Sequence, residues 1–188
     1  MIDWRLRIGG LVLVASLVMY GAQTASAEII DRILAVVSGQ IITKSDVEGA
    51  RALGLIEAQG SDEAALQALI DRVLMLSEVR RVVPREPTEA AINERVAAIR
   101  GRFPSPAALQ QALAASGISE PIIRIYAEDD LSLAAYLDER FSAAAEPTDQ
   151  EVLQAGEANR RKLADERRRT LIGAWVAELR RRADISLL

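Results

Sequence analysis

Apolar residues change their spacing along the chain, and each change marks an expected element. Within residues 31–43, two short runs rich in β-branched residues flank Ser38, Gly39 and Gln40. That arrangement predicts a β-hairpin whose turn uses Gly39 at positive φ. Because two strands alone are marginally stable, a third strand should join them. Residues 184–188 form the other β-like stretch, and we expect them to pair with the hairpin and bring the ends of the folded chain together.

Between these strands, apolar residues recur at steps of three and four, the spacing of one face of an α-helix. Residues that favour a first helical turn precede each run: Ser45 with Glu48, Ser61, Thr88, Ser105 with Pro106, Ser119 with Pro121, and Thr148 with Glu151. The first helix should end near Leu55, the second before Pro84 and the fourth near Gly117. The pattern leaves open whether the last helical region continues past Gly156.

The longer helices carry apolar stripes that predict which faces are buried. The fifth helix is expected to bury one stripe: Ile122, Ile125, Tyr126, Leu133, Tyr136 and Leu137. The second half of the last helix is amphipathic, and Trp175 on its stripe is expected in the core. The pattern thus predicts a mainly α fold of several helices with a small antiparallel sheet, formed by an N-terminal hairpin and the C-terminal strand. Residues 148–188 should form a C-terminal helix and strand that pack back on the hairpin.

The first 27 residues have the three-part layout of a secretory signal peptide. Arg5 and Arg7 precede an uncharged apolar run over residues 8–20, and Ala25 and Ala27 form a small-x-small cleavage pattern. The run is shorter than the roughly 20 residues that a membrane-spanning helix needs, although an uncleaved anchor is the alternative. We therefore expect cleavage after Ala27, export, and a mature domain over residues 28–188 with no stable membrane insertion.

The chain contains no cysteine and no histidine. Disulfides, thiol nucleophiles, thiolate metal sites, Ser-His-Asp triads and histidine ligands are therefore excluded. Lysine occurs only at Lys44 and Lys162, and neither follows a serine by three residues, so the Ser-x-x-Lys arrangement is absent as well. No glycine-rich phosphate loop is present. The composition favours binding over catalysis, and we expect no catalytic residues, no cofactor and no metal site.

Charge is concentrated in two places. The acidic cluster Glu128, Asp129 and Asp130 lacks the spacing of a calcium-binding loop. Since neighbouring helix positions point in different directions, we expect a solvated helix face there rather than a metal site or a catalytic carboxylate pair. Residues 28–156 carry a net charge of -9 and residues 157–188 one of +4. The basic end should complement the acidic body of the same molecule, and nucleic acid is not an expected partner.

An ordered set of motifs resembles the SurA family of periplasmic chaperones. Its members open with a hydrophobic hairpin, a small polar turn, Ile/Val-Thr-x-Ser-Asp and a helix, as residues 32–47 do here. Further similar segments follow in the same order: residues 66–75, the helix start at Pro87, Thr88 and Glu89, residues 112–118, residues 147–152 and residues 175–188. The ordered set spans residues 32–188, nearly the whole expected mature chain.

The chain departs from that family between Val152 and Leu171. Members of the family carry one or two parvulin prolyl isomerase modules at this point, whereas the segment here is far too short to hold one. The histidines that line parvulin sites are also absent. The resemblance therefore implies the chaperone core without isomerase activity, and the protein is not expected to be an enzyme.

The resemblance implies a periplasmic, ATP-independent holdase that binds unfolded exported or outer-membrane polypeptides on an apolar surface. Residues at expected helix ends and junctions are the candidates for this surface: Leu55, Ile56, Phe103, Ile118, Ile122 and Tyr126. Each of them also suits an ordinary core position. The alternative is a non-catalytic structural or assembly subunit that holds one specific envelope partner. The pattern does not give the oligomeric state.

We expect no acceleration of prolyl cis–trans isomerisation, because the chain has neither room for a parvulin module nor a histidine to line its site. A protease-coupled assay on a proline-containing peptide measures this rate, with a parvulin as the positive control. A rate above the uncatalysed one would show that the departure from the family has been misinterpreted.

Overall fold

A computed structural model describes residues 31–56, 60–82 and 86–188. Residues 31–188 belong to one compact unit. The expected signal peptide, with its cleavage site after Ala27, lies outside the described residues. The structure therefore tests the predictions for the expected mature domain, and the prediction of export stays a prediction.

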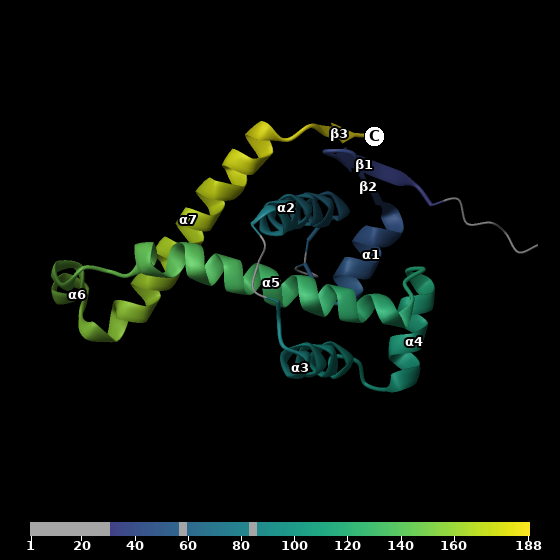
Figure 1. Ribbon diagram of the computed structural model, residues 1–188, viewed down its shortest axis with the longest axis horizontal. Helices are drawn as coiled ribbons and strands as arrows, with labels where there is room; N and C mark the ends of the chain where they lie inside the picture. Colours follow the sequence, from purple (N-terminus) through teal and green to yellow (C-terminus); the bar gives the residue numbers. More distant parts are fainter. Residues whose placement is uncertain (1–30, 57–59, 83–85) are drawn as a thin grey trace, which may run out of the picture. The chain divides into compact units, whose positions relative to one another are not determined.

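Three antiparallel strands form the sheet in the order β2-β1-β3. They are β1 (Ile33–Val37), β2 (Gln40–Thr43) and β3 (Ile185–Leu187). Ser38 and Gly39 both have positive φ, 49° and 85°, as a type I′ hairpin turn requires. The C-terminal strand lies along β1 (Figure 1), with Ser186 opposite Val36. The predicted hairpin and its pairing with the chain end are confirmed.

Helices make up most of the described chain: α1 (Lys44–Ala52), α2 (Asp62–Arg81), α3 (Glu89–Arg100), α4 (Pro106–Ala115), α5 (Glu120–Ala145), α6 (Asp149–Ala155) and α7 (Arg160–Arg182). A short 3₁₀ turn, Glu157–Asn159, lies between α6 and α7. The longest helix, α5, contacts α2, α3 and α7, and Figure 1 shows it beside each of them. The predicted fold class, mainly α with a small antiparallel sheet, is confirmed.

Local capping explains where most helices begin. The hydroxyls of Ser61, Thr88 and Ser105 each accept a hydrogen bond from the backbone amide three residues later. Thr148 and Glu151 form the predicted capping box at the start of α6. These bonds satisfy amides that have no partner within their own helix, and they begin α2, α3, α4 and α6 where the sequence predicted.

The predicted start of α1 was wrong. Thr43 caps the helix instead of Ser45, and Asp46 completes the capping box in place of Glu48. The Asp46 amide donates to the Thr43 hydroxyl at 3.2 Å, and the Asp46 carboxylate accepts from the Thr43 amide at 2.9 Å. Thr43 is the last residue of β2 and still has an extended backbone. The helix therefore begins directly from the strand, and Ser45 is already inside it.

The end of α1 also differs from the expectation that it would reach Leu55. The helix ends at Ala52, and Gly54 takes a positive φ of 67°. Arg102, from the segment before α4, donates through Nη1 to the carbonyl oxygens of Leu53 and Gly54, at 2.7 and 3.0 Å. The guanidinium group of Arg102, distant in sequence, thus supplies the hydrogen bonds that a further helical turn would otherwise give to these carbonyls. The helix ends without that turn.

The buried stripe in the first half of α5 is rotated from the predicted one, whereas in the second half Leu133 is buried and Tyr136 and Leu137 pack against the core as predicted. The helix starts after Ser119 with Pro121 in its first turn, as expected. Ile123 and Ala127 are completely buried, however, whereas Ile125 is 53% exposed. The apolar pattern failed here because Ala127, a small residue that the pattern does not mark, occupies the position against the second core cluster.

Two main core clusters hold the helices together. The first joins the sheet and α1 to α2 and α7 around the fully buried Ile70, and the second joins α3 and α4 to the first half of α5 around Ile99 and Ile123. Trp175 is 7% exposed in the first cluster, as predicted. Its ring centroid lies 5.6 Å from that of Tyr136, a distance typical of aromatic packing.

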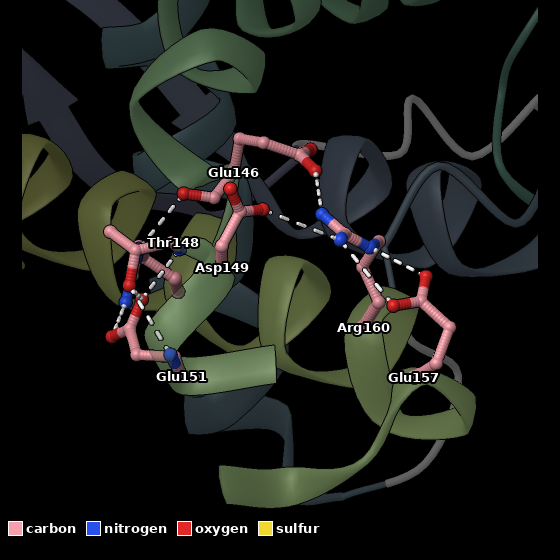
Figure 2. Close-up of polar contacts among 7 residues, drawn as sticks. Glu146, Thr148, Asp149, Glu151, Glu157 and Arg160 are labelled. Atoms are coloured by element: carbon pink, nitrogen blue, oxygen red, sulfur yellow. Dashed lines mark hydrogen bonds and ion pairs between the residues drawn. The ribbon is translucent and has the colours of Figure 1, made fainter. Parts of the chain in front are cut away.

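The chain turns from α5 to α7 through residues 146–160, which we call the elbow. Gly156 has a φ of 87° and ends α6, so the last helical region is not continuous. Figure 2 shows Arg160 among three carboxylates, 3.2 Å from Glu146, 3.8 Å from Asp149 and 2.8 Å from Glu157. Hydrogen bonds to Glu157 and Glu146 raise the pKa of Arg160. One guanidinium thus links α5, α6 and the start of α7.

The basic end of the chain is ion-paired to the acidic body, as the charge distribution predicted. Arg167 binds the Glu151 carboxylate and donates to the Glu146 carbonyl at 3.0 Å. Arg168 lies 3.6 Å from Asp138 of α5. Further along α7, Arg180 pairs with Asp71 of α2. Much of the positive charge of α7 is therefore used within the molecule.

We expect the elbow to loosen in acid. Hydrogen bonds from the backbone and side chain of Thr148, followed by the bond from Arg167, lower the pKa of Glu151 below its ordinary value of 4.5. A lowered folded-state pKa contributes stability that is present above the ordinary pKa and lost as the pH falls through the lowered one. The protection of α6 amides against hydrogen exchange, corrected for the intrinsic pH dependence of exchange, should therefore fall below pH 4.5 in the wild type.

The variant Glu151→Gln should not show that pH step, because its side chain does not ionise. Glu139→Gln, at an exposed position of α5, is the matched control and should keep the wild-type profile. An acid step of unchanged size in Glu151→Gln would assign the transition to other groups.

Candidate functional site

A pocket of about 250 Å³ lies between the hairpin and the helices α1, α2 and α5. We call it the hairpin pocket. Its lining comes from four elements and the segment after α1: Gln40, Ile41, Ile42, Asp46, Ala50, Leu55, Leu69, Arg72, Val73, Leu76, Arg80, Ile125, Tyr126 and Asp129. It is of the size that takes one or two side chains of a ligand, a little below the usual range of about 300 Å³ and more for small-molecule sites.

The rim of the hairpin pocket carries two large apolar side chains that face water. Ile41 of β2 and Ile125 of α5 are each 53% exposed. Ile41 is exposed because strand side chains alternate between faces, and its neighbour Ile42 already fills the core. Single exposed apolar residues need no explanation, but these two line the same pocket.

The acidic cluster on α5 does not form the solvated face that the sequence predicted. The Asp130 side chain is 14% exposed and lies between two guanidinium groups, 2.7 Å from Arg72 of α2 and paired with Arg95 of α3. The neighbouring carboxylate of Asp129 lies 3.1 Å from Arg80. The prediction was wrong because the charges on α2 and α3 that draw Asp130 inward are far from it in sequence.

Arg72 forms part of the pocket and is almost completely buried, with 9% of its side chain exposed. Its Nη1 faces Asp130, whereas its Nη2 is buried without a hydrogen-bond acceptor among the described residues. Burying a charged donor without an acceptor is costly. This atom is therefore an unsatisfied donor within the packed interior, shielded from the open part of the hairpin pocket.

Tyr126 is a further polar residue of the pocket lining. Burial raises the pKa of its phenol, Asp46 and Asp129 raise it further, and the charge of Arg72 opposes them. The hydroxyl is therefore protonated throughout the physiological range and able to donate a hydrogen bond. The lining thus combines apolar side chains with polar and charged ones, among them Gln40, Asp46, Arg80 and Asp129.

The structure brings together two of the six candidates that the sequence suggested. Leu55 and Tyr126 line the hairpin pocket. Ile56 is buried in the first core cluster, and Phe103 and Ile118 pack partly buried against the second. Ile118 also covers Gly49 of α1, where an added Cβ would lie 2.0 Å from its Cδ1. The remaining candidate, Ile122, is half-buried on α5 and lies outside the pocket lining.

Sequence analysis missed twelve of the fourteen residues that line the hairpin pocket, among them Ile41, Arg72 and Ile125. The alternation of β2 contained a signal for Ile41, because only one of the adjacent Ile41 and Ile42 can point inward. Arg72 carried a weaker signal, a lone cation within the apolar run of α2. Nothing local distinguished Ile125 from the buried positions of α5.

A second depression, of about 360 Å³, lies between β1, α1 and the C-terminal residues. Four of its charged side chains form two ion pairs, Lys44 with Glu48 at 3.4 Å and Arg51 with Asp62 at 2.9 Å. In each pair at least one side chain is exposed to solvent, and such exposed ion pairs contribute little to stability. The hairpin pocket is therefore the stronger candidate for a binding site.

Within the described ranges, acidic side chains nowhere gather in a group able to hold a metal ion, and no described helix is both long and apolar enough to span a membrane. Comparison with known proteins found no matching family model and no matching curated protein. Fold and site together define a mainly helical protein with a half-open pocket. Two exposed isoleucines line this pocket, together with polar and charged side chains.

Replacing Asp130 with asparagine should lower the free energy of unfolding by about 3 kcal/mol, because two arginines would lose their shared carboxylate in a mostly buried setting. The adjacent change Asp129→Asn is the matched control and should cost less than about 1 kcal/mol, since its partner Arg80 is largely exposed. Urea denaturation at neutral pH measures both. Equal losses would mean that Asp130 does not hold α2 and α3 against α5.

Proposed function

We propose that this protein is an ATP-independent periplasmic chaperone, a holdase that binds unfolded exported or outer-membrane polypeptides at the hairpin pocket and performs no prolyl isomerisation. The observation that carries the proposal is the half-open pocket whose lining includes two exposed apolar side chains, Ile41 and Ile125. An apolar rim offers an unfolded chain a place to bury its own apolar side chains.

The energetics of such a pocket suit temporary binding. Full burial of one aliphatic side chain is worth roughly 1.5–3 kcal/mol, and Ile41 and Ile125 are already about half covered. A few kcal/mol corresponds to dissociation constants near the millimolar range for a single contact. Clients would be captured weakly and released without nucleotide hydrolysis, and longer segments would gain affinity by using several contacts.

Two features of the sequence support the same function. The ordered motifs that resemble the SurA family run from the hairpin to the C-terminal strand, and the elbow replaces the segment where that family carries its isomerase modules. The absence of cysteine and histidine removes the residue types of most hydrolytic and isomerase sites. Binding without chemistry is the activity that these residues suit.

Changing both rim residues to serine, Ile41→Ser with Ile125→Ser, should weaken the suppression of client aggregation. The expected effect is a roughly tenfold higher chaperone-to-client ratio at half-suppression, because the lost apolar contact amounts to one or two kcal/mol. Light scattering from several unrelated unfolded clients measures it. Both residues are exposed, so thermal unfolding should be nearly unchanged.

Leu153→Ser is the matched control, because Leu153 is 85% exposed on α6 and does not line the hairpin pocket. It should suppress aggregation as the wild type does. If excess wild-type protein suppresses no client, the holdase proposal fails. Crosslinking in the periplasm then separates the alternatives, since a single recovered partner supports an assembly subunit and a broad set of partners supports a chaperone.

A further inference from the structure

The strand β3 forms one edge of the sheet. In the described part of the chain it pairs with β1 alone, and Figure 1 shows it beside that strand at the end of the chain. The amide of Ser38 donates to the carbonyl of Asp184 at 2.7 Å, and the amide of Leu188 donates to the carbonyl of Leu34 at 3.0 Å. These two bonds lie at the two ends of β3 and fix which residues of the ladder exchange hydrogen bonds.

The ladder decides which backbone groups of β3 point away from β1. In an antiparallel pair, opposite residues that exchange hydrogen bonds alternate with opposite residues that do not. Counting inward from the two end bonds, Ser186 is the hydrogen-bonded partner of Val36, and Ile185 and Leu187 occupy the positions between. The amides and carbonyls of Ile185 and Leu187 therefore point away from β1, and no described residue bonds to them. The free edge thus offers two donors and two acceptors in a row.

The side chains of the same two residues lie on the covered face of the sheet. Ile185 and Leu187 stand opposite Val37 and Ala35, which are both buried in the core. Because opposite residues of paired strands share a face, a strand added at this edge would place alternate side chains next to these two. Leu187 is 56% exposed and lines the second depression of about 360 Å³, so an apolar side chain placed there gains contact.

This edge lacks several features by which proteins protect a free strand. Charged side chains, proline and bulges normally block such edges, but residues 185–187 include neither charge nor proline, and the pairing of β3 with β1 is regular. A stable complex of two folded copies buries about 1,200–2,000 Å², which an edge of three residues does not supply. A flexible, extended chain segment suits so short an edge better than a second copy does.

We infer that the free edge of β3 binds an extended segment of an unfolded polypeptide as a fourth, antiparallel strand of the sheet. Client residues opposite Ile185 and Leu187 exchange main-chain hydrogen bonds with them, and an apolar client side chain packs beside Leu187. This inference rests on the proposed function and adds a contact separate from the hairpin pocket. Every client residue carries the same backbone groups, so these bonds do not depend on the client's sequence.

The first test uses the full chain and a short fluorescent peptide of alternating leucine and threonine, with lysine at both ends for solubility. In antiparallel pairing, the client residues that bond to β3 are those whose side chains lie on the covered face, where leucine is favoured. N-methylation of the leucines should therefore weaken binding roughly tenfold or more, because it removes two hydrogen bonds. The matched peptide with N-methylated threonines should bind within about twofold of the unmodified one in fluorescence anisotropy.

Amide hydrogen exchange locates the contact on the protein. Saturating peptide should slow the exchange of the Ile185 and Leu187 amides roughly tenfold or more, because a bound strand gives both of them acceptors. The Ser186 amide is the internal control and should change less, since it is already bonded to Val36. The rim variant Ile41→Ser with Ile125→Ser should keep this protection, because the edge lies outside the hairpin pocket.

Two substitutions at one position separate the hydrogen bond from the side chain. Leu187→Pro removes the outward amide without removing a bond to β1, a position at which edge strands tolerate proline. Leu187→Ala removes most of the side chain and keeps the amide. The proline variant should bind the unmodified peptide roughly fivefold more weakly than the alanine variant, the loss expected for one neutral hydrogen bond. If the proline variant does not fold, the methylated peptides on the wild type decide.

Three results overturn the inference. The first is no peptide binding by the wild type, and the second is a loss from threonine methylation equal to or larger than that from leucine methylation. The third is edge protection that rises with protein concentration alone, which would assign the edge to a second copy. If clients are protected while both methylated peptides bind alike, the edge contact is wrong and the holdase function stands. If binding depends on the leucine amides but no client is protected, the edge contact is correct and the holdase function fails.

Discussion

The Asp130 carboxylate lies between the guanidinium groups of Arg72 and Arg95, and the packing of α2 and α3 against α5 depends on that neutralisation. A carboxylate this deeply buried is tolerated only when opposite charges and hydrogen bonds surround it. Here each flanking helix supplies one cation, so the ionic contact ties three helices at a single point. The two core clusters lie on either side of it, and α5 contributes to both.

The same ionic contact lies beside the hairpin pocket, because Arg72 both pairs with Asp130 and lines the pocket. The rim is formed by Ile41 of β2 and Ile125 of α5, which are each 53% exposed. Under the proposed function, weak apolar contacts at such a site would hold a flexible chain without fixing it, because ordering that chain costs entropy that a small contact area barely offsets.

The elbow turns the chain from α5 to α7 and is held there by ion pairs. Arg160 and Arg167 fasten the short α6 to its neighbours, and Arg168 and Arg180 pair α7 with α5 and α2. The β3 strand that follows α7 then completes the sheet begun by the hairpin. The arginines of the basic end thus hold α7 against the rest of the fold through ion pairs within the molecule.

Features set by near neighbours in the chain were predictable from the sequence alone. The hairpin turn and the caps at Ser61, Thr88 and Ser105 depend on interactions that close within a few residues, and the pairing of the basic end with the acidic body follows from the charge distribution. The tertiary structure alone decided that Asp130 is mostly buried, that Ile125 is exposed, and that Leu55 and Tyr126 line the hairpin pocket while Phe103 and Ile118 do not. Burial is a property of what packs against a side chain, and for these residues the packing partners come from helices distant in sequence.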